Sequence, residues 1–291
     1  MSIVFKSSTD FKTNKIISFN LDEEHLDGDA RKIYDSLEFD SELQFGKLYR
    51  QRDSEDYWFV DTERNFAYIV LPDRVDLIKE WNSNNLLPDN ELWEKLQSIG
   101  GTPPHLWTMS QDYIDFPCQT MDLNGKWTDF CIIRFTKVPP FETYFKNIKL
   151  LKDIQDVKPS EYAMPHKLRV SSTLTDEIRM SFSPFTVKTK SGKRITYNGI
   201  TNFTSTGEIR ADEIEKEIEF SYDHFKKIQD TPFDQKTFVI GKWDSRLAKM
   251  LNDLKEERKK TAPNNSYKQA GDSAKSKTSI LNKIWSWLTG N

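Results

Sequence analysis

The most constraining feature of the sequence is a hairpin signal in the middle of the chain. Asn124-Gly125 separates two runs rich in β-branched and aromatic residues, at 116–123 and 126–135. Asn and Gly both tolerate a positive φ, which a two-residue type I′ turn requires at its two central positions. The middle of the chain is therefore predicted to form two antiparallel strands joined by a type I′ turn, with the run 129–135 as a central strand.

Similar short apolar runs, bounded by polar turns, recur on both sides of this hairpin and predict further strands. Before it, they lie at 3–5, 16–19, 43–49, 57–60 and 66–71. After it, they lie at 168–174, 178–182, 185–189, 194–197 and 237–240. The tightest turn after the hairpin is expected at Ser191-Gly192, because glycine adopts a positive φ readily.

Apolar residues at helical spacing predict helices between these strands. They lie at 22–37, 75–81, 92–99, 141–154, 214–228 and 247–254. Gly28 is expected to weaken the first of these helices in its middle. Asp73, Asp89 and Asp244 each precede an apolar periodicity, and we expect their carboxylates to cap the helices that follow.

Strands and helices that mix without strict alternation indicate an α+β fold, with antiparallel sheets built from a meander and hairpins and packed against several helices. The 19 Phe, 10 Tyr and 8 Trp provide large side chains for a core. We expect one globular body at 1–254, in which a sub-boundary near 155–167 stays open. A basic flexible linker is expected at 255–278, because this segment has no periodic apolar face.

The segment 279–290 separates its apolar and polar positions most cleanly. At about 100° per residue, six apolar side chains fall on one arc of a helix; they are Ile280, Leu281, Ile284, Trp285, Trp287 and Leu288. Such a face must be covered by a groove, a bilayer or a distant part of the same chain. We interpret it as a docking helix that binds a protein partner, with anchoring to a membrane and packing on the parent body as alternatives.

Charge is distributed unevenly along the chain. The formal net charge is −3, but the residues from Asp244 onward include ten Lys or Arg against five Asp or Glu. An acidic body argues against a main surface that clamps nucleic acid. The basic tail could contact a nucleic-acid backbone or an anionic membrane surface, and the candidate residues for this contact are Lys259, Lys260, Lys275, Lys277 and Lys283.

Candidate catalytic residues are few. Cys118 with His105 or His166 could form a thiol nucleophile and its base, since such partners meet in space rather than in sequence. The residues around Cys118 contain no glycine to form a nucleophile elbow, so we predict no catalytic site and retain these three residues as weak candidates. Cys131 lies on one strand face with Ile133, which favours a buried apolar role. No local spacing of His and Cys indicates a metal site, and no motif indicates a cofactor.

The two cysteines and an N-terminal segment without an apolar secretory core predict a cytoplasmic protein, or one attached peripherally to a membrane. No apolar run reaches the ~18 residues that a membrane-spanning helix needs. The functional hypothesis is a non-enzymatic adaptor or accessory protein whose body binds one partner and whose C-terminal helix binds a second protein. The alternatives are a peripheral membrane protein anchored by its basic tail and a hydrolase or nuclease with dispersed active-site residues.

Overall fold

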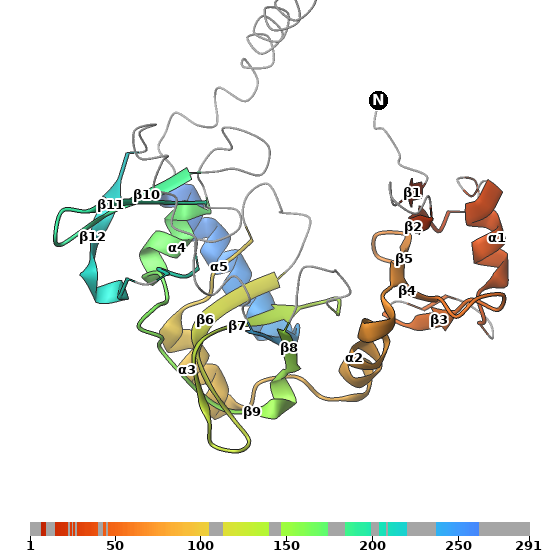
Figure 1. Cartoon of the computed structure of the whole chain (residues 1–291), viewed down its shortest axis with the longest axis horizontal. Coiled ribbons are helices and arrows are strands. Elements are labelled where there is room, and N and C mark those ends of the chain that lie inside the picture. Colours follow the sequence, from red (N-terminus) through yellow and green to blue (C-terminus); the bar gives the residue numbers. More distant parts are fainter. Residues whose placement is uncertain are drawn as a thin grey trace, which may run out of the picture.

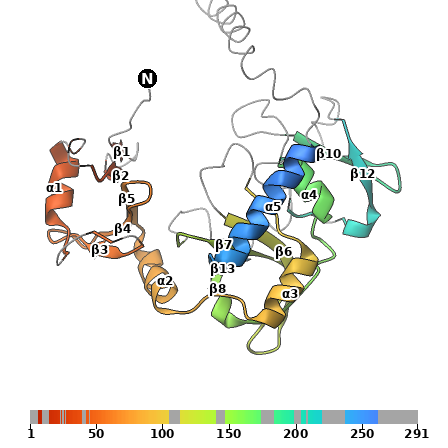
Figure 2. The same ribbon diagram turned by 180° about the vertical axis from the view of Figure 1, so that it is seen from behind.

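The computed structural model describes residues 7–9, 15–22, 24, 26, 28–39, 43–44, 46–104, 113–139, 147–173, 184–198, 204–207, 209–219 and 237–261. These residues form three β-sheets and five α-helices. The first sheet lies at one end of the molecule, the third at the other end, and the central sheet between them (Figure 1). Figure 2 shows the same arrangement from behind. The predicted α+β class is confirmed.

The first sheet is antiparallel throughout. Its strands lie in the order β1 (Ser7–Thr9), β2 (Ile16–Asn20), β5 (Phe66–Val70), β4 (Tyr57–Asp61) and β3 (Leu48–Arg50). The core beside this sheet is built on Phe19 and Trp58, whose ring centroids are 5.1 Å apart. The predicted meander is present, but β3 is shorter than the strand expected at 43–49 and begins only at Leu48.

Helix α1 (Gly28–Ser36) packs against this core through the buried Ala30. Helix α1 is shorter than the helix expected at 22–37. Gly28, which was expected near the middle of the helix, is its first residue. Gly28 has a φ of 44°, outside the helical region, so the regular helix cannot extend back through it. Helix α2 (Pro72–Ser83) then connects the first sheet to the central one.

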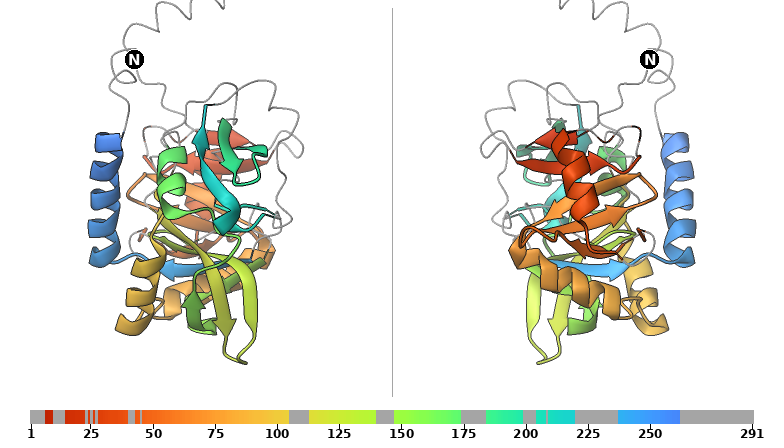
Figure 3. Two further views of the ribbon diagram at one scale, coloured as in Figure 1. Left: turned by 90° about the vertical axis from the view of Figure 1, so that its left-hand side faces the viewer. Right: turned by 90° about the vertical axis from the view of Figure 1, so that its right-hand side faces the viewer.

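The central sheet is mixed. Its order is β8 (Asn147–Leu150), β13 (Thr237–Lys242), β7 (Trp127–Thr136), β6 (Tyr113–Asp122) and β9 (Ile154–Lys158). Strand β13 is inserted between β7 and β8 and runs parallel to both. Helices α3 (Asn90–Ile99) and α5 (Ser245–Thr261) pack against this sheet through Leu96, Leu247 and Leu251 (Figure 3).

The helix predicted at 141–154 is wrong from residue 147 onward. That segment forms β8, the short 3₁₀ turn η3 (Leu151–Asp153) and β9. Strand β8 pairs with β13, and β9 pairs with β6, so both take partners far away in the sequence. Apolar residues three and four apart favour a helix, but a segment with this spacing forms a strand when distant strands offer it backbone partners.

The third sheet has the order β11 (Arg194–Asn198), β10 (Pro184–Thr189) and β12 (Ile214–Ile218). β10 and β11 confirm the strands predicted there, and the strand expected at 178–182 lies outside the described residues. The helix predicted at 214–228 is wrong over its first residues, which form β12. Ile214 and Ile218 are four residues apart, a spacing that fits one helical turn and also two repeats of a strand.

The strand predicted at 168–174 is also wrong over its described residues, because α4 (His166–Ser172) is a helix. Alternating apolar residues such as Leu168 and Val170 suggested a strand. Instead, Leu168 and Arg169 donate their backbone N–H groups to the carbonyl of Pro165 at 2.9 and 3.0 Å and so close the first helical turn. The guanidinium of Arg169 holds this turn against the end of α3 by donating to the carbonyls of Ile99 and Gly100.

The turn of the central hairpin is not of type I′. Asn65 is the one non-glycine residue with positive φ in the described part of the chain, so Asn124 does not adopt the required conformation. Gly125 (φ 78°) donates to the carbonyl of Asp122 at 2.9 Å, and the Asp122 N–H donates to the carbonyl of Lys126 at 3.0 Å. This is a three-residue loop in which a type I turn is followed by a left-handed glycine. Gly192 (φ 85°) ends the β10–β11 turn in the same way.

Two of the three predicted helix caps are present. The carboxylate of Asp89 accepts the Leu92 N–H at 2.8 Å, and that of Asp244 accepts the N–H groups of Arg246 and Leu247 at 2.9 and 3.1 Å. Asp73 caps nothing, because α2 begins with Pro72 and its N-cap residue is Leu71. Proline suits this first position because it lacks the N–H that would have no partner there.

Helix α5 continues to Thr261, beyond the boundary expected at residue 254 and into the predicted linker. The remainder of the linker and the docking helix at 279–290 lie outside the described residues and stay predictions. None of the described helices combines the length and the apolar character that crossing a membrane requires.

Candidate functional site

A pocket of about 180 Å³ lies where the first sheet, α2 and the central sheet meet. It is lined by Glu63, Trp81, Lys137, Lys242 and Trp243. Glu63 comes from the turn between β4 and β5, and Trp81 comes from the last turns of α2. The other three residues lie at or just beyond the ends of β7 and β13. The pocket thus combines two indole rings, two ammonium groups and one carboxylate.

The parallel pairing of β7 and β13 determines which residues reach this pocket. Thr136 pairs with Lys242 at the carboxyl ends of the two strands, and Lys137 and Trp243 follow directly. The Trp243 N–H donates to the carbonyl of Thr136 at 3.1 Å, which holds the two strand ends together. The carboxyl ends of parallel strands are a common position for binding sites, because consecutive loops converge there.

Helix α2 positions Trp81 by packing into two cores at once. Its residues Val75 and Ile78 belong to a buried cluster beside the first sheet, together with Phe59. Trp81, further along the helix, packs into the core of the central sheet. An ion pair between Glu80 and Lys152 of η3, at 3.1 Å, also ties this end of the helix to the central sheet.

Lys242 is held in place by carbonyl groups rather than by an acid. Its Nζ donates to the carbonyls of Asn84 at 2.7 Å and Asn82 at 3.3 Å, and it lies 5.0 Å from the ring centroid of Trp81. Within the described part of the chain no carboxylate forms an ion pair with it. Partial burial therefore lowers the pKa of Lys242, because desolvation penalises the charged amine.

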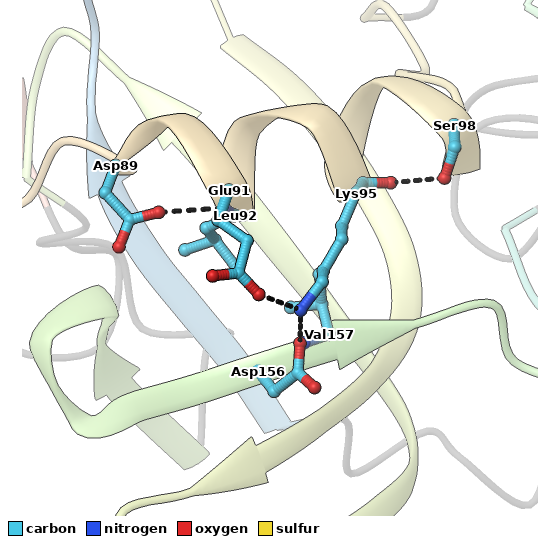
Figure 4. A network of polar contacts seen from close by, with 7 residues as sticks. All are labelled: Asp89, Glu91, Leu92, Lys95, Ser98, Asp156 and Val157. Atoms are coloured by element: carbon cyan, nitrogen blue, oxygen red, sulfur yellow. Dashed lines mark hydrogen bonds and ion pairs between the residues drawn. The ribbon is translucent and has the colours of Figure 1, made fainter.

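Lys95 shows the contrasting situation. Its Nζ lies 2.7 Å from a carboxylate oxygen of Glu91 and 2.8 Å from one of Asp156, so that α3 is tied to β9 (Figure 4). The bonds to Asp156 and Glu91 raise the pKa of Lys95, and the bond from Lys95 lowers the pKa of Asp156. Such a network is complete without a ligand, whereas the cation of Lys242 has no carboxylate partner among the residues that the structure describes.

Trp81 contributes a second incomplete interaction. Its side chain is only 7% exposed, and its indole N–H is buried with no acceptor among the described residues. A buried donor without a partner costs about 1–3 kcal/mol, and nearly all such donors in folded proteins are satisfied. Because almost none of the surface of this nitrogen is accessible, the unpaired donor is a cost of the fold and not a contact for a ligand.

The lining residues define what the pocket can hold. Lys137 and Lys242 outnumber the one acid, Glu63, so a group with acceptor oxygens and a negative charge is favoured. Small-molecule sites usually enclose roughly 300–1,000 Å³. At about 180 Å³, this pocket suits a single side chain or another small group.

The weak catalytic candidates lie elsewhere. Cys118 on β6 is paired with Cys131 on β7, and both thiols are free and fully buried. Burial raises the pKa of Cys118 well above its ordinary value and that of Cys131 to about 12. The interpretation of Cys131 as a small buried apolar residue agrees with this environment. His105 lies outside the described residues.

His166 is the first residue of α4, and its imidazole packs against the backbone of Gly100. Its Nε2 lies 3.0 Å from the carbonyl of Gly101, where a protonated nitrogen can donate a hydrogen bond. In the described chain no hydrogen bond links His166 to Cys118. The structure therefore does not show the contact between thiol and base that nucleophilic catalysis requires.

We expect His166 to make folding stability depend on pH. Burial, followed by the charge of Arg169, lowers its pKa, although Gly101 and Glu257 act in the opposite direction. Below pH ~6.5 the unfolded chain binds a proton at this residue before the folded chain does, so stability falls as pH falls through this window. Urea unfolding at pH 7.5 and 5.5 measures the effect. The variant His166→Gln should lose part of the difference, and an unchanged difference would contradict this assignment.

The residues predicted for partner and polyanion contacts cannot be placed in a site. Ile280, Leu281, Ile284, Trp285, Trp287 and Leu288 lie outside the described residues, as do Lys275, Lys277 and Lys283. Lys259 and Lys260 belong to the last turns of α5. Over the ranges that the structure describes, no three His, Cys, Asp or Glu side chains gather as a metal site would require.

Sequence reasoning missed the pocket because its residues are spread from position 63 to position 243. The one local signal is the dipeptide Lys242-Trp243 at the end of a predicted strand, which places a cation beside an aromatic ring. Comparison with protein-family models, with curated proteins and with solved structures finds no match to this chain. The function of this chain is therefore inferred from the geometry of the pocket and from the sequence of the tail.

Proposed function

We propose that this protein is a non-enzymatic adaptor or accessory protein. Its body binds one partner at the pocket between α2 and the ends of β7 and β13, and its C-terminal amphipathic helix binds a second protein. The observation that carries the first part is the ammonium of Lys242, which lines the pocket beside the ring of Trp81 and has only carbonyl acceptors among the described residues. This ammonium is built into the fold and gains energy from an external anion.

The tail supports the second part. The segment 279–290 has six apolar residues on one helical face, including Trp285 and Trp287. Aromatic anchors of this kind dominate the affinity of many protein interfaces. Only Lys283 lies on the polar face of this predicted helix, whereas helices at membrane surfaces usually carry several basic residues there. A protein groove is therefore favoured over a bilayer.

Binding is also favoured over catalysis by the state of Cys118. A catalytic thiol needs a lowered pKa and access to solvent, and Cys118 has a raised pKa and no exposed surface. We expect neither Cys118 nor Cys131 to react with a thiol reagent such as Ellman's reagent in the folded protein, and both to react in urea. A fast-reacting thiol in the native protein would instead support the hydrolase or nuclease alternative.

The adaptor proposal predicts two independent losses of binding. Partners captured by the full chain and identified by mass spectrometry should be compared with those captured by a chain ending at Thr278 and by the variant Lys242→Met. We expect the truncation to lose one partner and Lys242→Met to lose the other. Lys249→Met, on the exposed surface of α5, is the matched control and should lose neither.

Each partner should then be tested as a purified protein against the same variants. A shift of the full chain, but not the truncated chain, in liposome flotation would favour a membrane anchor over a protein groove. A fall in melting temperature on truncation, without loss of any partner, would show that the tail packs on its own body. If neither the truncated chain nor Lys242→Met loses a partner, the adaptor proposal is refuted.

A further inference from the structure

Helix α4 lies between the third sheet and α5 and makes two chemically different contacts (Figure 2). It packs against the third sheet through apolar side chains, whereas it contacts the end of α3 through the polar side chains of His166 and Arg169. We propose that the contact with α3 is a pH-sensitive joint, in which protonation of His166 releases α4 and the third sheet, as one unit, from the end of α3. This device is separate from the pocket and goes beyond the proposed function.

The apolar contacts make α4 part of the core of the third sheet. Leu168 of α4 and Met164, just before the helix, pack with residues from all three strands; these are Phe185, Val187, Ile195, Tyr197 and Ile214. The Met164 N–H also donates to the carbonyl of Thr204 at 3.0 Å, and the Ser171 hydroxyl donates to the carboxylate of Glu217 at 2.8 Å. None of these contacts involves His166, so we expect α4 to stay with the third sheet when its contact with α3 is lost.

The contact with α3 comes from a single turn of α4. Arg169 donates to the carbonyls of Ile99 and Gly100 at 2.9 and 3.0 Å. Nε2 of His166 lies 3.0 Å from the carbonyl of Gly101. The imidazole packs directly on Gly100, where a Cβ would overlap the ring and where the φ of 78° also favours glycine. A proton taken up by His166 would therefore place a second positive charge at the seam between α4 and α3.

The charges around His166 oppose that proton. Arg169 is 2% exposed, and no carboxylate forms an ion pair with it within the described residues. Glu257 on α5 favours the protonated imidazole, as does the carbonyl of Gly101, while Lys167 beside it on α4 is exposed. Burial, followed by the charge of Arg169, outweighs the two favourable groups, so the pKa of His166 lies below its ordinary value while the joint is closed.

Linkage gives the direction of the effect. A released His166 in water takes up a proton near pH ~6.5, whereas the closed joint takes it up only at lower pH. The released state therefore binds the proton first, and the joint weakens as the pH falls below ~6.5. One proton can shift this equilibrium by at most about tenfold per pH unit. Local opening of this kind exposes one cooperative part of a fold while the rest stays closed.

Hydrogen–deuterium exchange of the full chain tests the joint, with mass spectrometry at pH 7.5 and 5.5 and correction for the intrinsic exchange rates. We expect peptides from 166–173, 184–198 and 209–219 to exchange at least about threefold faster at pH 5.5, and peptides from β6 and β7 to stay unchanged. His166→Gln should remove the difference. Glu257→Gln should enlarge it, because the folded protein loses a charge that favours the protonated imidazole. Asp253→Asn, also exposed on α5, is the matched control and should leave it unchanged.

Three outcomes would overturn the inference. Equal acceleration in the third and central sheets would show that acid weakens the whole fold. No acceleration in either sheet would show that the joint does not respond to pH. Acceleration that persists in His166→Gln would assign the effect to another group. If His166→Gln does not fold at pH 7.5, as judged by circular dichroism, the pair Glu257→Gln and Asp253→Asn decides, and an equal pH dependence in these two variants would reject the joint.

Discussion

Replacing Arg169 with methionine is expected to lower the free energy of unfolding by about 3 kcal/mol, because it leaves several buried acceptors without a donor. The side chain is 2% exposed. Its Nε donates to the carbonyl of Met164 at 2.7 Å, and its Nη2 donates to that of Ile99 at 2.9 Å. Its Nη1 donates to the carbonyl of Gly100 at 3.0 Å and to the hydroxyl of Thr102. One guanidinium thus joins α4 to the end of α3.

The expected loss is smaller than the sum of these bonds because methionine also removes a buried charge. No carboxylate forms an ion pair with Arg169 within the described residues, and burial lowers its pKa to about 10. Replacing buried charges with apolar residues is sometimes neutral or stabilising. Here the acceptors are mostly backbone carbonyls that remain in place, so we expect their desolvation to dominate.

Urea unfolding of the full chain, followed by tryptophan fluorescence and circular dichroism, measures this difference. Arg210→Met is the matched control, since Arg210 has a half-exposed side chain and pairs with Glu161 and Asp212 near the surface. We expect this control to change stability by less than about 1 kcal/mol. If Arg169→Met and Arg210→Met have the same free energy of unfolding, the carbonyl groups released by Arg169 must find other partners.

The change Gly241→Ala is expected to destabilise the protein by about 2–3 kcal/mol, as overpacking of a tight core does. Gly241 on β13 is directly paired with Phe135 on β7. An added Cβ would overlap Cε1 of Phe135 and would lie 3.1 Å from the carbonyl oxygen of Leu86. Phe135 is fully buried and packs edge-on against Phe116 at 5.8 Å between ring centroids, which leaves its ring little room to move.

A double-mutant cycle tests this mechanism. Phe135→Leu alone should destabilise by leaving a cavity, but in the Gly241→Ala background it should cost less, because the smaller side chain makes room for the new methyl group. The coupling energy is expected to be at least about 1 kcal/mol for residues in such direct contact. Strictly additive losses would show that the glycine is required for another reason.

Local sequence patterns predicted much of the fold and failed where two periodicities coincide. The strands of the β4–β5 and β6–β7 hairpins and the helices α3 and α5 each have one dominant spacing, and Asp89 and Asp244 cap the helices as expected. Ile214 and Ile218 are compatible with a helix and with a strand, so only pairing with β10 decides between them.

Long-range pairing is the part that local patterns could not supply. Nothing near residues 237–242 indicates that β13 inserts between β7 and β8 in parallel orientation. That insertion brings Lys242 and Trp243 beside Trp81 and so creates the pocket. The site could not be predicted because it depends on this topology, whereas the amphipathic tail could be identified because its spacing is local.

The most direct test measures, by isothermal titration calorimetry, how tightly the full chain binds the purified partner that a chain ending at Thr278 still captures. Lys242→Met is expected to weaken this binding at least about tenfold, because the pocket loses a cation, and Lys249→Met is expected to leave it unchanged. Equal binding by the full chain and by Lys242→Met would contradict the proposed site.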